Sequence, residues 1–504
     1  MPKSENNLQD GCGGFSTKDV ENSLAWKGMI SPSADKKFAV INPARMCQPL
    51  GAVHALLGVK GAMPLIHGSQ GCSTYMRFQL CRHFREPINI SSTSMSESTV
   101  VYGGEKNLIK ALDIITRQYK PELIGVTSSC LTETIGDDME LIIANFLKSN
   151  NDFPVIPIST PSYTGSHVEG YNQALRALVE KLVNPVSVRH SGEKSTIGST
   201  YTDKKLNNLR GDPKYTNKNY NGKINLITGL ISPSDVFSMK ILLQEMGLES
   251  IILTDTSQSL HLPLNGEINF IPSQGTTIAQ IKDTIHSRAT ICISRHADSA
   301  GIFLEKNFGV KLINIPLPVG LSATDHLVET LSVVGNKKIP ENINLQRGQL
   351  LDAMVDAHAY NYKRRVAIYG EPDMVTGLTR FLSELGMHPV VVCTGTQSNI
   401  FQDEIESLAR EHGHDIQIIS GGDLYDLEQK IVEEDVELLL GNSYSARIAS
   451  EKNIPLIRVG FPVFDRIGAQ RINITGYQAG LNLLDTITNT IIERYYEPGR
   501  DDKI

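Results

Sequence analysis

The chain has 504 residues, of which 40% are hydrophobic and 20% charged, proportions that are ordinary for a globular protein. Because single hydrophobic cores stop growing at roughly 250–300 residues, we expect two to four domains. The formal net charge of −7 argues against nucleic acid as the main partner, since phosphate binding requires a basic surface.

The sequence also argues against a membrane protein or a secreted one. It contains no apolar run of transmembrane length, and its polar N-terminus lacks the apolar region of a signal peptide. We therefore expect a cytoplasmic protein with no membrane partner, whose cysteines are buried thiols or metal ligands rather than disulfides. The cysteines stand at positions 12, 47, 72, 81, 130, 292 and 393.

The first part of the chain begins with a polar extension over residues 1–38 and continues with an α/β region over 39–186. Within that region, apolar runs predict strands at 62–66, 121–129 and 153–160, and an amphipathic pattern predicts a helix at 137–150. Residues 187–221 are rich in polar residues and almost lack large apolar ones, so they predict a linker or surface insertion.

The rest of the chain repeats the alternation of strands and helices, over 222–345 and again over 346–504. In the second segment, SPSD predicts a helix N-cap after the strand at 223–230, and further strands are expected at 251–255, 290–295 and 310–318. In the third segment we expect helices at 347–361 and 479–497, with strands at 365–370, 388–396, 416–422, 437–442 and 455–462. This rhythm predicts an α/β fold of three doubly wound, Rossmann-like domains with parallel sheets flanked by helices.

Three cysteines follow predicted strands in the first α/β region. Cys47 comes after the strand-like KFAVINP, Cys72 ends the loop HGSQGC, and Cys130 follows PELIGVTSS. In open α/β sheets, ligands bind beyond the carboxyl ends of the strands. The cysteines are too far apart for a local CxxC zinc knuckle, but thiolates from separate loops are what an iron–sulfur cluster needs.

The alternative is that each cysteine is a buried apolar thiol, which we would favour for any one of them alone. Three at loop positions of one domain shift the balance towards a metal site. We expect Cys81, Cys292 and Cys393 to pack in the core. Ser162 could supply an oxygen ligand, although a turn or cap role is the more common one for serine. The stretch RHFREP, residues 82–87, predicts a solvated or salt-bridged surface.

Common nucleotide and hydrolase motifs are missing. The sequence has no GxxxxGK[ST], GxGxxG, HExxH or GxSxG. It therefore gives no support for ATP or NAD chemistry inside this chain.

Several ordered motifs resemble the beta branch of the nitrogenase component 1 superfamily. These are NPARMCQPLGA, HGSQGC, RHFREP, VYGGEKN, CLTETIGDD and TPSYTGSHVEGY, followed by PLPVGLSATD, QRGQLLDAMVDAH, YGEPD and GFPVFDR. The resemblance covers nearly the whole chain from about residue 40. It implies the α/β fold expected above.

Within that branch the chain resembles the NifN type, a scaffold subunit for assembly of the iron–molybdenum cofactor. GFPVFDR lacks the histidine run that usually follows it in the catalytic beta subunit, and GCSTYMR, LLLGNSYSA and QRGQLLDAM also look more like NifN. This resemblance implies an α2β2 heterotetramer with a NifE-like chain and a shared interface [4Fe–4S] cluster, for which Cys47 is a ligand. It also implies a cofactor precursor held mainly in the partner, the nitrogenase iron protein as a further partner, and no catalytic residue or independent turnover in this chain.

Two alternatives stay open. Many NifN-type chains have glycine where this chain has Cys130, whereas Cys72, Cys130 and Ser162 match positions that help hold the larger P-cluster of the catalytic beta subunit. The resemblance thus also allows a beta subunit of the nitrogenase molybdenum–iron protein. A binding module whose cysteines are all structural is the third interpretation.

Overall fold

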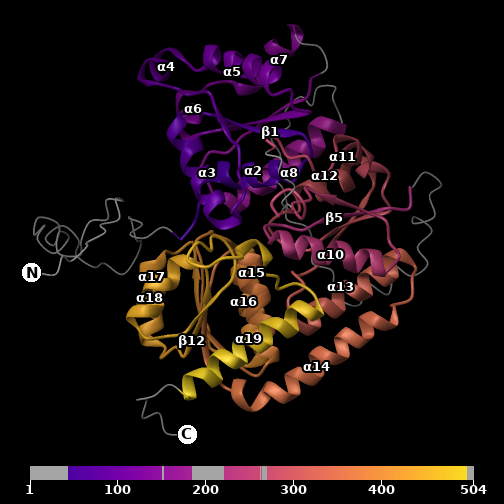
Figure 1. Cartoon of the computed structure of the whole chain (residues 1–504), viewed down its shortest axis with the longest axis vertical. Coiled ribbons are helices and arrows are strands. Elements are labelled where there is room, and N and C mark those ends of the chain that lie inside the picture. Colours follow the sequence, from indigo (N-terminus) through magenta and orange to yellow (C-terminus); the bar gives the residue numbers. More distant parts are fainter. Residues whose placement is uncertain (1–43, 150–152, 184–220, 262, 264–268, 497–504) are drawn as a thin grey trace, which may run out of the picture. The chain divides into compact units, whose positions relative to one another are not determined.

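The computed structural model describes residues 44–149, 153–183, 221–261, 263 and 269–496. The expected extension at 1–38, Cys12 and nearly all of the expected insertion at 187–221 lie outside these residues, as does the strand expected just before Cys47. The described residues form three separate parallel sheets, each flanked by helices (Figure 1). The predicted α/β fold class is therefore confirmed.

The first sheet carries the candidate cysteines and has the strand order β2-β1-β3-β4. Its central strand β1 is buried along its whole length, as expected for a strand covered by helices on both faces. The strands are β1 (Ala62–His67), β2 (Ser91–Ser92), β3 (Leu123–Ser128) and β4 (Val155–Ile158). The helices are α2 (Gln48–Leu57), α3 (Gln70–Phe84), α4 (Glu97–Tyr102), α5 (Glu105–Gln118), α6 (Cys130–Ile135), α7 (Met139–Ser149) and α8 (His167–Val183).

The second sheet has the order β6-β5-β7-β8. The predicted N-cap is confirmed, because the Ser232 side chain accepts a hydrogen bond from Asp235 N at 3.0 Å. The strands are β5 (Ile224–Ile227), β6 (Ser250–Leu253), β7 (Ala289–Cys292) and β8 (Lys311–Asn314). The helices are α10 (Pro233–Glu245), α11 (Ile278–Asp283), α12 (Ser299–Phe308), α13 (Gly320–Gly335) and α14 (Glu341–Asn361).

The third sheet has the order β11-β10-β9-β12-β13. The strands are β9 (Arg365–Tyr369), β10 (His388–Thr394), β11 (Gln417–Ser420), β12 (Leu438–Gly441) and β13 (Leu456–Arg458). The helices are α15 (Pro372–Glu384), α16 (Asn399–His412), α17 (Leu424–Glu433), α18 (Ala446–Glu451) and α19 (Tyr477–Tyr495).

The second and third sheets share one apolar core. A single cluster of buried residues runs from Ile224 and Leu327 to Phe381 and Leu484, and α14 packs beside α19 at its edge (Figure 1). The chain thus has three sheets but not three isolated cores. The domain limits 39–186, 222–345 and 346–504 stay a prediction.

One helix differs from its expected extent. α14 begins at Glu341, six residues before the predicted start at 347. Its first turns carry polar residues, and only Ile343 is buried there, so the apolar periodicity used for the prediction is missing.

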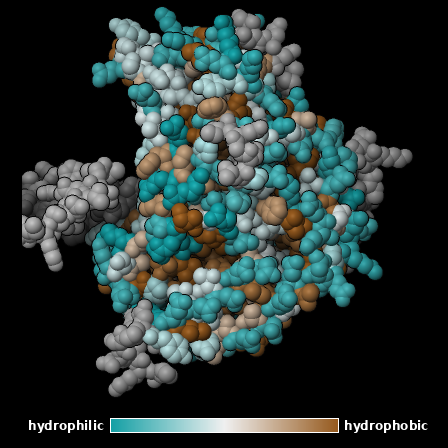
Figure 2. Space-filling view, in the orientation of Figure 1, coloured by the Kyte–Doolittle hydropathy of each residue, from teal (hydrophilic) through white to brown (hydrophobic). Residues whose placement is uncertain are grey.

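No helix in the described ranges is both long enough and apolar enough to cross a bilayer. The face drawn in Figure 2 is a mosaic of hydrophilic and hydrophobic residues.

Candidate functional site

Cys72 follows strand β1 and Cys130 follows strand β3. These two strands are neighbours at the topological switch point of the first sheet. From β1 the chain goes to β2 on one side, whereas β3 is followed by β4 on the other. Such a switch point opens a crevice beyond the carboxyl ends of the strands, because the two loops diverge. Cys72 lies in the first turn of α3 after β1, and Cys130 is the first residue of α6 after β3. The Ser162 loop follows β4, the next strand of the same sheet.

Cys47 lies near the loops of Cys72, Cys130 and Ser162 because of a contact between two helices. It is the N-cap residue of α2, and α2 packs against α8, which begins just after the Ser162 loop (Figure 1). Two glycines allow this packing: a Cβ on Gly51 would lie 1.7 Å from the His167 carbonyl oxygen, and one on Gly170 would lie 1.9 Å from the Gln48 carbonyl oxygen. Only residues without a Cβ fit at such a close approach.

Hydrogen bonds fix the Cys47 segment to the Ser162 loop. Gln48 Nε2 donates to the Pro161 carbonyl and to Thr164 Oγ1, both at 3.0 Å. In addition, the backbone N–H of His167 donates to the Met46 carbonyl at 3.0 Å. The residues on either side of Cys47 are therefore held by the residues that flank Ser162.

A hydroxyl network joins the ends of β3 and β4. Ser128 donates to Glu133 and accepts from Thr160 N at 2.7 Å, while Ser159 donates to Glu133 at 2.7 Å. The β1 loop fits against the same region, because a Cβ on Gly68 would lie 2.4 Å from Ser129 Oγ. The Cys72, Cys130 and Ser162 loops are thus fixed to one another.

The three thiols interact electrostatically. Partial desolvation by the surrounding protein raises the pKa of Cys47 above its usual value near 9.0, and the Cys130 and Cys72 thiols raise it further. The Ser162 hydroxyl and Arg45 oppose this shift. Cys47 and Cys130 are exposed and Cys72 is half-buried, so the thiols face solvent in this chain. Since Cys47 is protonated at neutral pH, a bound metal would have to displace its proton.

Ser162 has a buried Oγ with no hydrogen-bond partner of normal geometry in the described part of the chain. The oxygen lies close enough to Cys47 to lower the pKa of that thiol. Buried hydroxyls normally have a partner, because an unsatisfied one costs roughly 1–3 kcal/mol. Among the residues described, Ser162 makes no cap hydrogen bond, and its position beside the Cys47 thiol suits a further ligand better than the cap role favoured from the sequence.

The donor set is suited to a cluster rather than to a single ion. Across the described residues, no three His, Cys, Asp or Glu side chains are arranged to hold one metal ion. Three separated thiols and a serine oxygen on one face instead match a group several atoms wide whose other ligands come from elsewhere. The residues therefore fit an iron–sulfur cluster shared with a partner.

The other cysteines within the described ranges do not enter the group of interacting thiols around Cys47. Cys292 and Cys393 are fully buried, as predicted, and Cys81 is partly buried against the cluster of Leu50 and Phe84. The sequence analysis missed Gln48 and His167, which hold Cys47 in place. Gln48 lies in NPARMCQPLGA and His167 in TPSYTGSHVEGY, but a polar side chain gives no sign in sequence of the distant segment it binds.

The surface expected for RHFREP is wrong for two of its residues. His83 and Phe84 are buried, and His83 Nδ1 accepts a hydrogen bond from Val463 N at 2.9 Å. Arg82 lies over the Phe464 ring, at 3.7 Å from its centroid. The charged residues of RHFREP suggested a surface segment, but this stretch contacts residues around Val463, 380 positions further along the chain.

Comparison with known proteins gives concordant results. Residues 47–492 match the family described as nitrogenase component 1 type oxidoreductase. The chain is 37% identical to the nitrogenase molybdenum-iron protein beta chain of Methanococcus maripaludis, covering 92% of this chain and 96% of that one. It is also 37% identical to the protein of the same name from Clostridium pasteurianum, over 91% and 95% of the two chains. A solved structure described as nitrogenase Cp1 at pH 6.5 superimposes with a TM-score of 0.83 at 35% identity, covering 93% of this chain and 97% of that one.

These relatives contradict the expectation of a NifN-type scaffold subunit for cofactor assembly. They are beta chains of the molybdenum-iron protein, and the similarity extends over nearly their whole length. The expectation rested on a missing histidine run and three short motifs. Such local differences weigh less than similarity that extends over the whole fold.

Proposed function

Because the chain belongs to the nitrogenase component 1 family, we propose that it is the beta-type subunit of a nitrogenase molybdenum–iron protein. The relatives with that name, which match more than nine-tenths of this chain, support the proposal. Proteins of this family bind iron–sulfur clusters and form α–β heterotetramers. In this proposal the partner is an alpha-type chain, the nitrogenase iron protein is the electron donor, and the complex works in the cytoplasm.

The single observation that carries the proposal within this chain is the gathering of Cys47, Cys72, Cys130 and Ser162 on one face. In the proposed function these four residues hold this chain's half of a P-cluster, and the alpha-type partner supplies the remaining ligands. Thiolate is the ligand that iron–sulfur clusters prefer. Cys130 and the unpartnered Ser162 oxygen support this interpretation over one in which Cys47 alone binds iron.

In this proposal the chain binds the cluster and shields it from water, and it does not transfer protons. A bound iron–sulfur cluster supplies one-electron transfer. The contact of α2 with α8 fixes Cys47, and the network of Ser128, Glu133 and Thr160 fixes the Cys130 loop. Loops fixed in this way would hold the ligand side chains in place for the cluster. We assign no catalytic residue to this chain.

Exposed apolar side chains near the cysteines support a partner on this face. Tyr163 follows Ser162, Tyr75 and Phe78 lie on α3 after Cys72, and Tyr102 ends α4, which packs against the helix of Cys130. Tyr75, Phe78, Tyr102 and Tyr163 are each at least half exposed in this chain. Aromatic residues are enriched at protein interfaces, where they bury large areas. A partner that covers them would also exclude water from the cluster.

Mössbauer spectroscopy tests the proposal. This chain is co-expressed with an alpha-type chain of the same family, and the complex is purified anaerobically. The proposal predicts interface iron beyond one [4Fe–4S] cluster for each pair of chains, with the spectrum of a larger cluster. Interface iron that a single [4Fe–4S] cluster accounts for would reject it. The variant Cys81→Ala serves as the control, because it removes a thiol outside the candidate site.

A further inference from the structure

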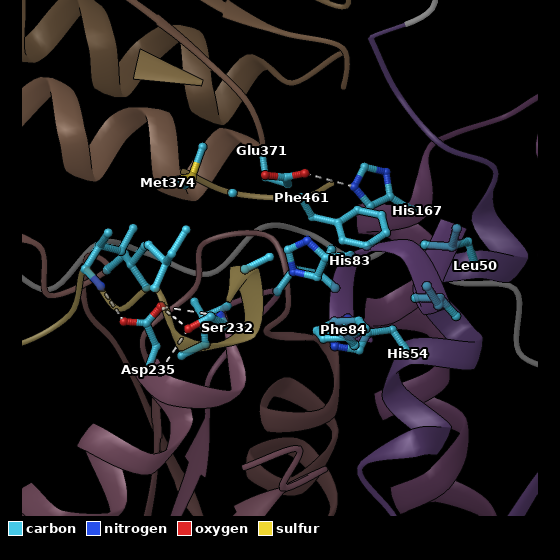
Figure 3. A pocket seen from close by; sticks show the side chains of 18 residues that line it. Leu50, His54, His83, Phe84, His167, Ser232, Asp235, Glu371, Met374 and Phe461 are labelled. Carbon is cyan, nitrogen blue, oxygen red and sulfur yellow. Dashed lines mark hydrogen bonds and ion pairs between the residues drawn. The ribbon is translucent and has the colours of Figure 1, made fainter. Parts of the chain in front are cut away.

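A cavity of about 60 Å³ lies where loops of the second and third sheets meet helices α2, α3 and α8, which flank the first sheet. Ile231 and Ser232 follow β5, Glu371 follows β9, and Gly460 and Phe461 follow β13, while residues of α2 and α3 close the other side (Figure 3). β5 and β9 each lie at the switch point of their sheet, beside β7 and β12. Crevices at such switch points are the usual ligand sites of open α/β sheets.

Glu371 is a buried carboxylate at this cavity with little to balance its charge. The residue is only 9% exposed, and its single side-chain partner in the described part of the chain is His167 Nε2, at a long 3.4 Å (Figure 3). The backbone N–H of Met46 donates to His167 Nδ1 at 3.3 Å, so Nε2 is the ring atom that can donate to Glu371. A buried carboxylate needs a positive partner or several hydrogen bonds, whereas Glu371, at the N-cap of α15, has this one long side-chain contact in the described part of the chain.

No other group on the wall supplies the missing positive charge. The lining contains no lysine or arginine among the residues described. Burial lowers the pKa of His54 to about 4 and that of His83 to about 3, so these two rings are neutral at pH 7.

The second carboxylate of the wall, Asp235, already has its partners. It accepts from Ile474 N at 2.7 Å, from Thr475 N and Oγ1 at 2.9 Å, and from Ser232 Oγ at 3.0 Å. Its role is to join the two segments it contacts, so Glu371 is the group that a ligand would meet.

The other residues that line the cavity suit a ligand with an apolar part and a positive charge. Leu317, Met374 and Ile474 contribute aliphatic surface. Phe84 and Phe461 stack at 6.2 Å between ring centroids, and the edge of His83 faces Phe461 at 4.9 Å. Aromatic rings attract cations through their faces, and the attraction grows when water is excluded.

We propose that this cavity binds a small organic ammonium ion, with the charged nitrogen beside Glu371 and the alkyl part among the apolar side chains. The volume limits the ligand to a few non-hydrogen atoms, since one water-sized probe needs about 10–15 Å³. This proposal is independent of the iron–sulfur cluster and of the enzyme activity proposed above.

Isothermal titration calorimetry of the assembled complex tests the proposal, with n-propylammonium chloride as the probe. The matched controls are n-propanol, which lacks the charge, and sodium propionate, which reverses it. We expect one n-propylammonium to bind per copy of this chain with a Kd of about 1–10 mM. Propanol and propionate should bind at least about tenfold more weakly, because one close charge pair is worth that much even when screened. Equal binding of propanol, or no binding of n-propylammonium, would overturn the proposal.

Glu371→Gln removes the charge and keeps the shape of the side chain. The variant should weaken n-propylammonium binding at least about tenfold and leave propanol binding unchanged. Glu341→Gln, at the exposed start of α14, is the control and should bind like the unaltered chain. Unchanged n-propylammonium binding by Glu371→Gln would also overturn the proposal. If this variant does not assemble, the comparison of the three ligands on the unaltered complex decides alone.

Discussion

Gly51 on α2 lies directly against the backbone carbonyl of His167 on α8, so that a Cβ at Gly51 would lie 1.7 Å from that oxygen. This contact places the N-terminus of α2, and with it Cys47, beside the loop of Ser162. The relationship ties a packing detail of two helices to the geometry of the candidate cluster site.

The first prediction concerns this contact. Gly51→Ala forces α2 away from α8 and should lower the free energy of unfolding by at least about 1–3 kcal/mol, the usual cost of overpacking. It should also lower the iron content of the complex, because Cys47 moves with α2. Gly348→Ala is the control, since Gly348 lies exposed on α14 with nothing near its Cβ position, and a helical alanine there should stabilise the chain by about 0.5–1 kcal/mol. Chemical denaturation and iron analysis check both variants.

The second prediction separates cysteines that bind a cluster from cysteines that only pack. Cys47→Ala and Cys130→Ala replace exposed side chains, so each should change the stability of the isolated chain by no more than about 0.5 kcal/mol. Both should reduce the interface iron of the complex, whereas Cys81→Ala should retain it. Full iron in Cys47→Ala and Cys130→Ala would favour structural cysteines.

The third prediction compares two serines of the same region. Ser162→Ala removes an unpartnered buried oxygen and should leave the stability of the isolated chain unchanged or raise it by up to about 1 kcal/mol. Ser128→Ala breaks hydrogen bonds to Glu133 and Thr160 and should cost about 1–3 kcal/mol. In the complex, Ser162→Ala should shift the reduction potential of the interface cluster. An unshifted potential would mean that Ser162 does not contact the cluster.

Much of this arrangement was readable in the sequence, for physical reasons. Buried parallel strands appear as continuous apolar runs, so β1, β3 and β4 and the loops after them were predicted. Cys72, Cys130 and Ser162 could then be placed at one sheet edge. The contact of α2 with α8 through Gly51 and Gly170 could not be predicted, because a glycine in a helix does not show which backbone packs against it. His83 was wrongly expected at the surface because its charged neighbours dominate that stretch.

The choice between scaffold and enzyme subunit failed for a different reason. The three short motifs and the missing histidine run are local features, and only GCSTYMR, through Cys72, includes a residue of the candidate cluster site. Cys130 and Ser162 do bear on that site, and both pointed to the alternative. The whole-chain comparison agrees with those two residues.

The fourth prediction concerns pH. Burial alone would lower the pKa of His296, but the Asp373 carboxylate at 2.8 Å raises it overall above its usual 6.5. Burial would likewise raise the pKa of Asp373, but His296 and further hydrogen bonds hold it below its usual 3.8. The stabilisation from His296 is therefore full below pH 6.5 and is lost as pH rises through its folded-state pKa. The stabilisation from Asp373 is present above pH 3.8 and is lost as pH falls through its folded-state pKa.

His296→Gln removes this pair, which joins the loop after β7 to α15. The variant should lose about 3–5 kcal/mol of stability at pH 5.5, because Asp373 is left buried without its partner. The loss should be smaller at pH 8.5, where His296 of the unaltered chain is itself losing its charge. Urea denaturation at the two pH values measures this difference, and an equal loss at both would contradict the ionised pair.

We propose that this chain is the beta-type subunit of an enzyme, and an acetylene-reduction assay tests this proposal most directly. The complex with the alpha-type chain is assayed anaerobically with nitrogenase iron protein, ATP and a reductant, beside the same complex carrying Cys130→Ala. We expect sustained acetylene reduction by the unaltered complex and a large loss in the Cys130→Ala variant. No acetylene reduction by an unaltered complex that contains its full iron would contradict it.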